Sequence, residues 1–133
     1  MKFRTAFLAL IAIYAINWIV LPLGIYGAFP WFDIPMHFAG GIATGMLGIA
    51  IHHAVTDKHH FKNSHFWYHV LFVAGFVMLI AVAWEFHEYI IDNTIGVWKH
   101  LSPSQPSIGD TMLDLFMGLV GGVSSVFIFK KNL

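Results

Sequence analysis

The chain has 133 residues, of which 58% are hydrophobic and 11% charged, and its mean hydropathy is +0.71. This composition excludes an ordinary soluble domain and predicts a small polytopic membrane protein. The seven basic and seven acidic side chains give zero net charge, which argues against nucleic acid as a partner and against a polybasic lipid-binding surface. Cysteine is absent, so disulfides and thiolate metal sites are excluded.

Four apolar stretches are long enough to cross a bilayer, which takes roughly 20 mostly apolar residues. We expect membrane helices at residues 5–23, 34–54, 66–91 and 108–129. The fold class is therefore predicted to be all-α, a four-helix transmembrane bundle that forms a single domain over residues 1–133.

The first stretch carries little that is diagnostic. It follows Lys2 and Arg4, as the apolar part of a signal peptide would. Its apolar run is longer than the roughly 7–15 residues of a signal peptide, and no convincing cleavage site follows, so we expect a retained helix. Asn17 is its only strongly polar side chain and is expected to hydrogen-bond to a neighbouring helix.

Each of the other three stretches carries two ionisable side chains near one end. These pairs are Asp33 and His37, Glu85 and Glu88, and Asp110 and Asp114. Residues three or four apart share a helix face, so each pair projects from one face. A carboxylate in hydrocarbon costs at least a few kcal/mol and normally faces the bundle interior, where it has a partner. We therefore expect the three pairs to face one another.

Glycines continue two of these faces. They are Gly41, Gly45 and Gly48 on the second stretch, and Gly118 and Gly121 on the fourth. Small residues mark the faces on which membrane helices approach closely. The ionisable pairs and the glycine rows are therefore predicted to point together into the bundle.

The basic residues predict the orientation in the membrane. Six of the seven fall on one side of a four-helix topology, namely Lys2, Arg4, Lys58, Lys62, Lys130 and Lys131. The opposite side has only Lys99. The positive-inside rule then predicts a multi-pass protein of the inner (plasma) membrane with both termini in the cytoplasm. The ionisable pairs would lie at the outer end, from the interface to a depth of about 10 Å.

No Lys or Arg within the stretches can pair with the acids, so their partners are protons, metal ions or a cationic ligand. Carboxylates suit Mg²⁺ and Mn²⁺, and an added imidazole brings in Zn²⁺ and Fe²⁺. We expect one or two divalent ions bound by Asp33, His37, Glu85, Glu88, Asp110 and Asp114. The simpler interpretation is a set of protonated acids that hydrogen-bond to one another or to the backbone.

Three segments that carry these residues resemble a known family. They are Phe32-Asp33-Ile34-Pro35-Met36-His37-Phe38-Ala39-Gly40-Gly41, Trp84-Glu85-Phe86-His87-Glu88-Tyr89, and the start of the fourth stretch from Ser107 through Asp110 and Asp114 to Gly121. In order and spacing they are similar to segments of YjdF-type and VanZ-like small integral membrane proteins. The resemblance covers the last three helices. It implies the same site positions, with a glutamine in VanZ-like proteins where this chain has Glu88, and it implies no particular reaction.

Three functions remain open. The first is a metal-binding membrane protein that acts as a hydrolase on a lipid or isoprenoid-phosphate head group, with Glu88 as the catalytic base. Lys99 is the only outer base available to bind a phosphate. The second is a small proton- or cation-coupled transporter, which could be a homo-oligomer, because chains of carboxylates serve as proton relays. The third is a structural subunit of a membrane complex. We rank the metal site first.

Histidines crowd the connection between the second and third stretches. They are His52, His53, His59, His60, His65 and His69. They could form a second metal site, or a pair such as His53 and His69 could ligate haem. We favour a solvated loop whose histidines titrate near the lipid head groups. His87 falls roughly opposite Glu85 on a helical wheel and is left out of the predicted site.

Overall fold

The computed structural model of the protein describes residues 3–59 and 65–130. Lys2, His60, Lys62 and Lys131, which enter the predictions of orientation and of the histidine cluster, lie outside the described residues, as do the side chains of Lys58 and His59. The described part of the chain consists of helices and turns without any strand, which confirms the predicted all-α class.

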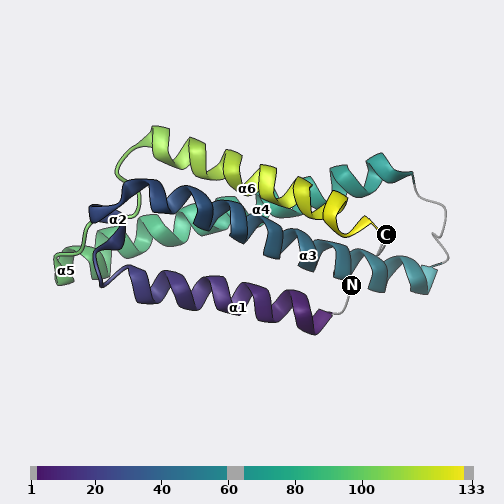
Figure 1. The fold of residues 1–133 in the computed structure, drawn as a ribbon, viewed down its shortest axis with the longest axis horizontal. Helices are drawn as coiled ribbons and strands as arrows, with labels where there is room; N and C mark the ends of the chain where they lie inside the picture. Colours follow the sequence, from purple (N-terminus) through teal and green to yellow (C-terminus); the bar gives the residue numbers. More distant parts are fainter. Residues whose placement is uncertain (1–2, 60–64, 131–133) are drawn as a thin grey trace.

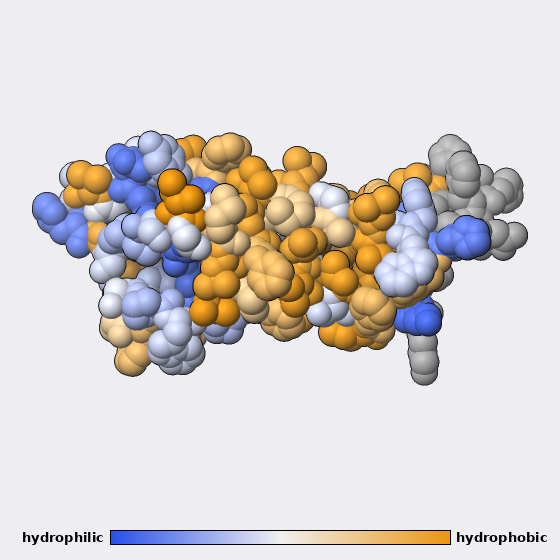
Figure 2. Space-filling view, turned by 90° about the horizontal axis from the view of Figure 1, so that it is seen from above, coloured by the Kyte–Doolittle hydropathy of each residue, from blue (hydrophilic) through white to orange (hydrophobic). Residues whose placement is uncertain are grey.

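Four long helices run side by side (Figure 1). They are α1 (Phe3–Val20), α3 (Asp33–His59), α4 (Phe66–Ile91) and α6 (Ile108–Ile128). Each is long and apolar enough to cross a membrane, which confirms the predicted four-helix transmembrane bundle. On the face seen in Figure 2, hydrophobic residues form a belt around the middle of the molecule and hydrophilic residues gather at both ends. This distribution is the one that a bilayer requires.

The first and last described residues lie at one end of the bundle, and the short helices lie at the other (Figure 1). These short elements are α2 (Ile25–Ala28), the 3₁₀ helix η1 (Pro30–Phe32), the π-helix η2 (Asp92–Gly96) and α5 (Val97–Lys99). The helix α1 ends at Val20, three residues before the expected end, because Pro22 disfavours helical backbone at the residue before it. The chain then turns through Gly24, whose φ of 68° suits glycine.

The closest helix contact is between α3 and α6, and it depends on glycine. A Cβ at Gly41 would overlap the carbonyl oxygen of Gly118, and a Cβ at Gly121 would overlap that of Phe38. A Cβ at Gly45 would overlap the hydroxyl of Ser125. Because these positions lack side chains, the two backbones come close enough to bring the first turns of both helices together.

The segment between α5 and α6 folds back over the short-helix end of the bundle. The backbone N–H groups of Ser104 and Gln105 donate to the two carboxylate oxygens of Asp92, both at 2.9 Å. Ser102 packs against Gly27, where a Cβ would overlap the serine hydroxyl. The hydroxyl of Ser107 then accepts a hydrogen bond from the backbone N–H of Asp110 at 3.2 Å and caps the start of α6. This segment covers the end at which the ionisable pairs lie.

Candidate functional site

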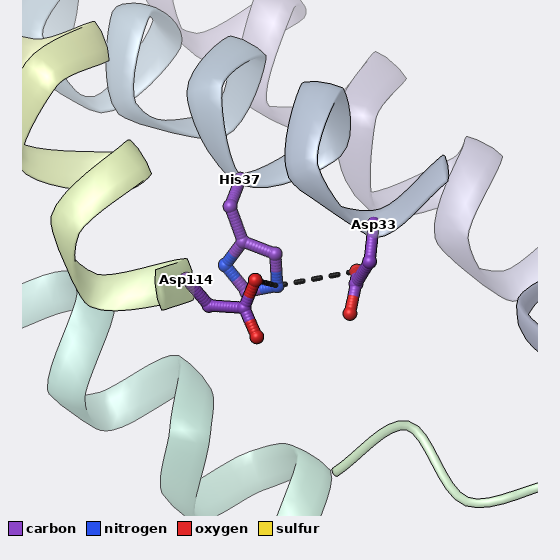
Figure 3. A group of neighbouring side chains, drawn as sticks. All are labelled: Asp33, His37 and Asp114. Carbon is purple, nitrogen blue, oxygen red and sulfur yellow. Dashed lines mark ion pairs between the residues drawn. The ribbon is translucent and has the colours of Figure 1, made fainter. Parts of the chain in front are cut away.

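Five of the predicted site residues meet around His37. Asp33 and His37 are one turn apart at the start of α3, Glu85 and Glu88 lie in the last two turns of α4, and Asp114 lies in the second turn of α6. The Nε2 atom of His37 is 3.3 Å from Oδ1 of Asp33, 3.9 Å from Oε2 of Glu88 and 3.9 Å from Oδ1 of Asp114. Its Nδ1 atom is 3.8 Å from Oε1 of Glu85. Figure 3 shows the imidazole between Asp33 and Asp114.

These distances fit the spacing of ligand atoms around a small metal ion. Nitrogen and oxygen ligands bind Zn²⁺ at about 2.0–2.2 Å, so neighbouring ligand atoms in a tetrahedral site are roughly 3.3–3.6 Å apart. Two overlapping groups approach this spacing, with all ligand atoms within 4.8 Å of one another: Asp33, His37 and Asp114, and His37, Glu85 and Glu88. The cluster could therefore hold a metal ion.

The carboxylates of this cluster are buried and poorly satisfied. Glu88 is 3% exposed and Asp114 is 1% exposed. Both carboxylate oxygens of Glu88 and the Oδ2 atom of Asp114 have no hydrogen-bond partner among the described residues. Burying an ionised carboxylate without a partner costs several kcal/mol, so each group requires a proton or a cation.

No lysine or arginine supplies that cation within the described chain. Every ion pair of these acids is made with His37. Lys99 lies over the ring of Trp98 with Nζ at 4.0 Å from its centre, and Lys130 lies over the ring of Phe66 at 4.9 Å. One imidazole faces four carboxylates, which leaves an excess of negative charge if all are ionised.

Asp110, the sixth predicted residue, lies outside both groups of ligand atoms. It is in the first turn of α6, one turn nearer the end of the bundle than Asp114, and it is only partly buried. Its Oδ2 atom is nevertheless inaccessible and has no hydrogen-bond partner among the described residues. Asp110 therefore lies at the rim of the cluster.

Two residues that the sequence did not indicate also reach the site. The side-chain amide of Gln105 donates a hydrogen bond to Oε2 of Glu85. Tyr26, in α2, is buried, and its hydroxyl has no hydrogen-bond partner in the described chain. Burial and then the negative charges of Asp33, Glu88 and Asp114 raise the pKa of Tyr26 above its ordinary value. Both residues come from connecting segments, where no periodic pattern could have indicated them.

The remaining histidines lie elsewhere. His87 packs among Tyr14, Trp18 and Trp84, with ring centres 5.1–6.4 Å away, and stays outside the cluster. His52 and His69 face each other across α3 and α4 with perpendicular rings 4.6 Å apart, and both are buried. The interpretation as a solvated loop is therefore wrong for this pair, although it fits the exposed His65.

The helices and the cluster together define a multi-pass membrane protein, resident in a lipid bilayer, with a buried carboxylate–histidine group that could hold a metal ion. The chain belongs to the family described as predicted membrane protein (DUF2238), whose sequence profile matches residues 1–132. No curated protein and no solved structure matches the chain.

Proposed function

We propose that the protein binds one or two divalent metal ions and uses them to act on the head group of a membrane lipid. The observation that carries the proposal is the arrangement of carboxylate oxygens at 3.3–3.9 Å from the two nitrogens of His37, in a buried site to which the described residues contribute no lysine or arginine. The ligands are Asp33, His37, Glu85, Glu88 and Asp114, with Asp110 at the rim.

The ligand set limits the choice of metal. One nitrogen with several carboxylates suits Zn²⁺, Mn²⁺ or Fe²⁺, and Mg²⁺ fits if the imidazole stays outside its coordination shell. A single ion would use Nε2 of His37 with Asp33 and Asp114. A second ion at Nδ1, which faces Glu85, would require His37 to lose its remaining N–H proton and bridge the two ions as an imidazolate. The four clustered carboxylates and the imidazolate would then carry five negative charges against the four positive charges of two divalent ions.

In its enzymatic form the proposal is the hydrolysis of a lipid phosphate monoester. A water molecule attacks phosphorus, and Glu88, the most buried of the glutamates, takes its proton. The bond between phosphorus and the lipid oxygen breaks, the leaving oxygen takes the proton from Glu88, and the lipid alcohol and inorganic phosphate are released. The metal neutralises charge on the phosphate, a task for which the described site offers no lysine or arginine.

The position of the cluster supports a head-group substrate. It lies at the end of the bundle where α2, α5 and the segment over residues 100–107 are found, next to the hydrophobic belt. We further propose that this end faces outward from the inner membrane with both termini cytoplasmic. The three segments around Asp33, Glu85 and Asp110, which resemble segments of YjdF-type and VanZ-like proteins, also support a relationship to those proteins.

A proton-coupled transporter is less well supported, because an apolar layer separates the cluster from the other buried histidines. Ile49, Val73, Val77 and Val126 pack together, each at most 1% exposed. In sequence Val73 and Val77 lie between His69 and Glu85 on α4. A proton relay would need polar groups or water through this layer.

Thermal stability in the presence of metal tests the proposal. Protein freed of metal with a chelator, and then of the chelator, should melt at a higher temperature as Zn²⁺ or Mn²⁺ is added, since a ligand at 100 times its Kd stabilises the folded state by about 2.7 kcal/mol. The increase should be lost in His37→Gln and kept in His65→Gln, which changes an exposed histidine at the other end of the bundle. Equal increases in both variants would contradict the proposed site.

A separate comparison tests the role of Glu88. In Glu88→Gln, hydrolysis of a lipid phosphate should fall by at least about 100-fold, because a general base contributes about 10²–10⁴-fold. The metal should still raise the melting temperature, because the group of Asp33, His37 and Asp114 binds it without Glu88. Unchanged hydrolysis would show that Glu88 is not the general base, and it would not contradict the proposed metal site.

A further inference from the structure

A cavity of about 100 Å³ adjoins the cluster. Leu10 and Ile13 of α1, Met36 of α3 and Ile80 of α4 form much of its mostly apolar wall, which also includes the polar Asn17 and Thr44. Asp33 and His37 line it where it adjoins the cluster, and we call this its polar end. It is partly open to the outside. Every helix that lines it is long and apolar enough to cross a membrane, so an opening between these helices would face lipid.

The cavity lies between α1 and α4, two helices that each pack mainly on α3 or α6 rather than on each other. Aromatic side chains bridge the two helices beside it, with the rings of Tyr14 and Trp84 edge to face at 5.9 Å. Side chains rather than close backbones therefore separate this space from the bilayer. A molecule could enter sideways from the membrane by displacing them.

The shape and lining select an amphiphile. Apolar walls offer water few hydrogen-bond partners, so a hydrocarbon chain is the better occupant, while the polar end faces the groups that would bind its head. An apolar cavity of about 150 Å³ holds a benzene-sized molecule, so this one, at about 100 Å³, holds roughly four carbon atoms. The rest of a longer chain would extend into the bilayer.

We infer that the cavity binds the carbons nearest the head group of a single-chain lipid phosphate, whose phosphate lies at the Asp33–His37 end. This inference rests on the proposed metal site, which supplies the attraction for a phosphate among carboxylates. A primary alcohol phosphate, whether its chain is an alkyl or an isoprenoid one, meets these requirements. A diacyl lipid does not, because two chains diverge close to its phosphate.

Gly40 gives the variant that tests the cavity. A Cβ at this position would meet only Cγ2 of Ile13 at 3.9 Å, so a larger side chain there fills the cavity without displacing backbone. Gly75 on α4 gives the matched control, since it is exposed and a Cβ there meets no atom within 4 Å. Both Gly40→Leu and Gly75→Leu add the same side chain to a membrane helix.

The experiment is photolabelling of the purified full-length protein with dodecyl phosphate that carries a diazirine at its third carbon. Labelling should concentrate on Ile13, Met36 and Ile80, and it should fall at least tenfold in Gly40→Leu and remain in Gly75→Leu. Unlabelled farnesyl phosphate should compete, whereas farnesol and phosphatidic acid should not. A probe with the diazirine at its eleventh carbon should label lipid-exposed residues instead.

The outcomes separate the cavity from the metal site. Equal labelling in wild type and Gly40→Leu would overturn the chain-binding cavity. Competition by phosphatidic acid would contradict the inference that the ligand has a single hydrocarbon chain. A third outcome is labelling that depends on Gly40 but survives a chelator and is blocked by farnesol as well as by farnesyl phosphate. It would contradict both the requirement for a phosphate and the proposed metal site, and it would show that the cavity binds a lipid alcohol.

Discussion

The chemistry of individual residues in this protein is set by an excess of buried carboxylates around one imidazole. His37 is surrounded by carboxylates from three helices, and its own side chain is 8% exposed. Such an arrangement is stable only if protons or cations neutralise it, because isolated buried charges are costly. Tyr26 responds to the same field and can report on it without belonging to a membrane helix.

Tyr26 should therefore ionise only at strongly alkaline pH in the metal-free protein. The difference between the alkaline absorbance titrations of wild type and Tyr26→Phe isolates this group, and it should titrate above the ordinary pKa of 10.0. As pH rises past that value, the unfolded chain loses the proton and the folded chain keeps it, so wild type should lose stability relative to Tyr26→Phe. Titration of Tyr26 at or below its ordinary pKa would contradict its placement beside the acids.

At the scale of elements, close helix contact and one folded-back connection build the site. The contact of α3 with α6 brings Asp33 and His37 beside Asp114. The two hydrogen bonds to Asp92 hold the connection that delivers Gln105 to Glu85. Either feature can be weakened by one substitution.

Substitution by alanine should be far less well tolerated at Gly41 than at its contact partner Gly118. Gly41→Ala forces the backbone of α6 away, which should cost about 1–3 kcal/mol, as overpacking does. Gly118→Ala adds a Cβ that meets Ala81 at an ordinary 3.7 Å, and it should be neutral or stabilise the helix by up to about 1 kcal/mol. Melting temperatures of the two variants measure the difference, and equal values would contradict the described contact.

Asp92 should stabilise the folded-back connection. Asp92→Ala removes the acceptor of two backbone hydrogen bonds and should cost about 1–3 kcal/mol. The neighbouring exposed Asn93→Ala loses one bond to the carbonyl of Tyr89 and should change stability by less than about 1 kcal/mol. Protease cleavage within residues 100–107 should increase only in Asp92→Ala, and unchanged cleavage would show that Asp92 does not hold this segment.

The sequence predicted elements better than connections. Long apolar runs gave the four membrane helices, and i,i+3 or i,i+4 spacing indicated which acids share a face. The end of α1 differed because Pro22 acts on the residue before it. Gln105 and Tyr26 could not be predicted, since tertiary contacts position the segments that carry them. Burial of His52 and His69 was missed because both lie in the expected helices beside a polar connection, and only the packing of α3 against α4 brings their rings together.

For the whole molecule, the two ends of the bundle should face opposite sides of the membrane, with α5 outside. The chain has no cysteine, so single-cysteine variants report cleanly. Lys99→Cys and Lys130→Cys place an exposed thiol at opposite ends. An impermeant thiol reagent added to intact cells should label only Lys99→Cys, and labelling of only Lys130→Cys would reverse the proposed orientation.

The most direct test of the central claim is the metal content of protein purified without chelator, measured by mass spectrometry of the elements. Wild type should retain one or two divalent ions per chain, and the double variant Glu85→Gln with Asp114→Asn should retain at most about a tenth as much. His65→Gln should match wild type. Retention should rise with pH, because metal ligands must be deprotonated to bind. Wild-type protein that holds no metal at any pH, or a double variant that holds as much as wild type, would contradict the account.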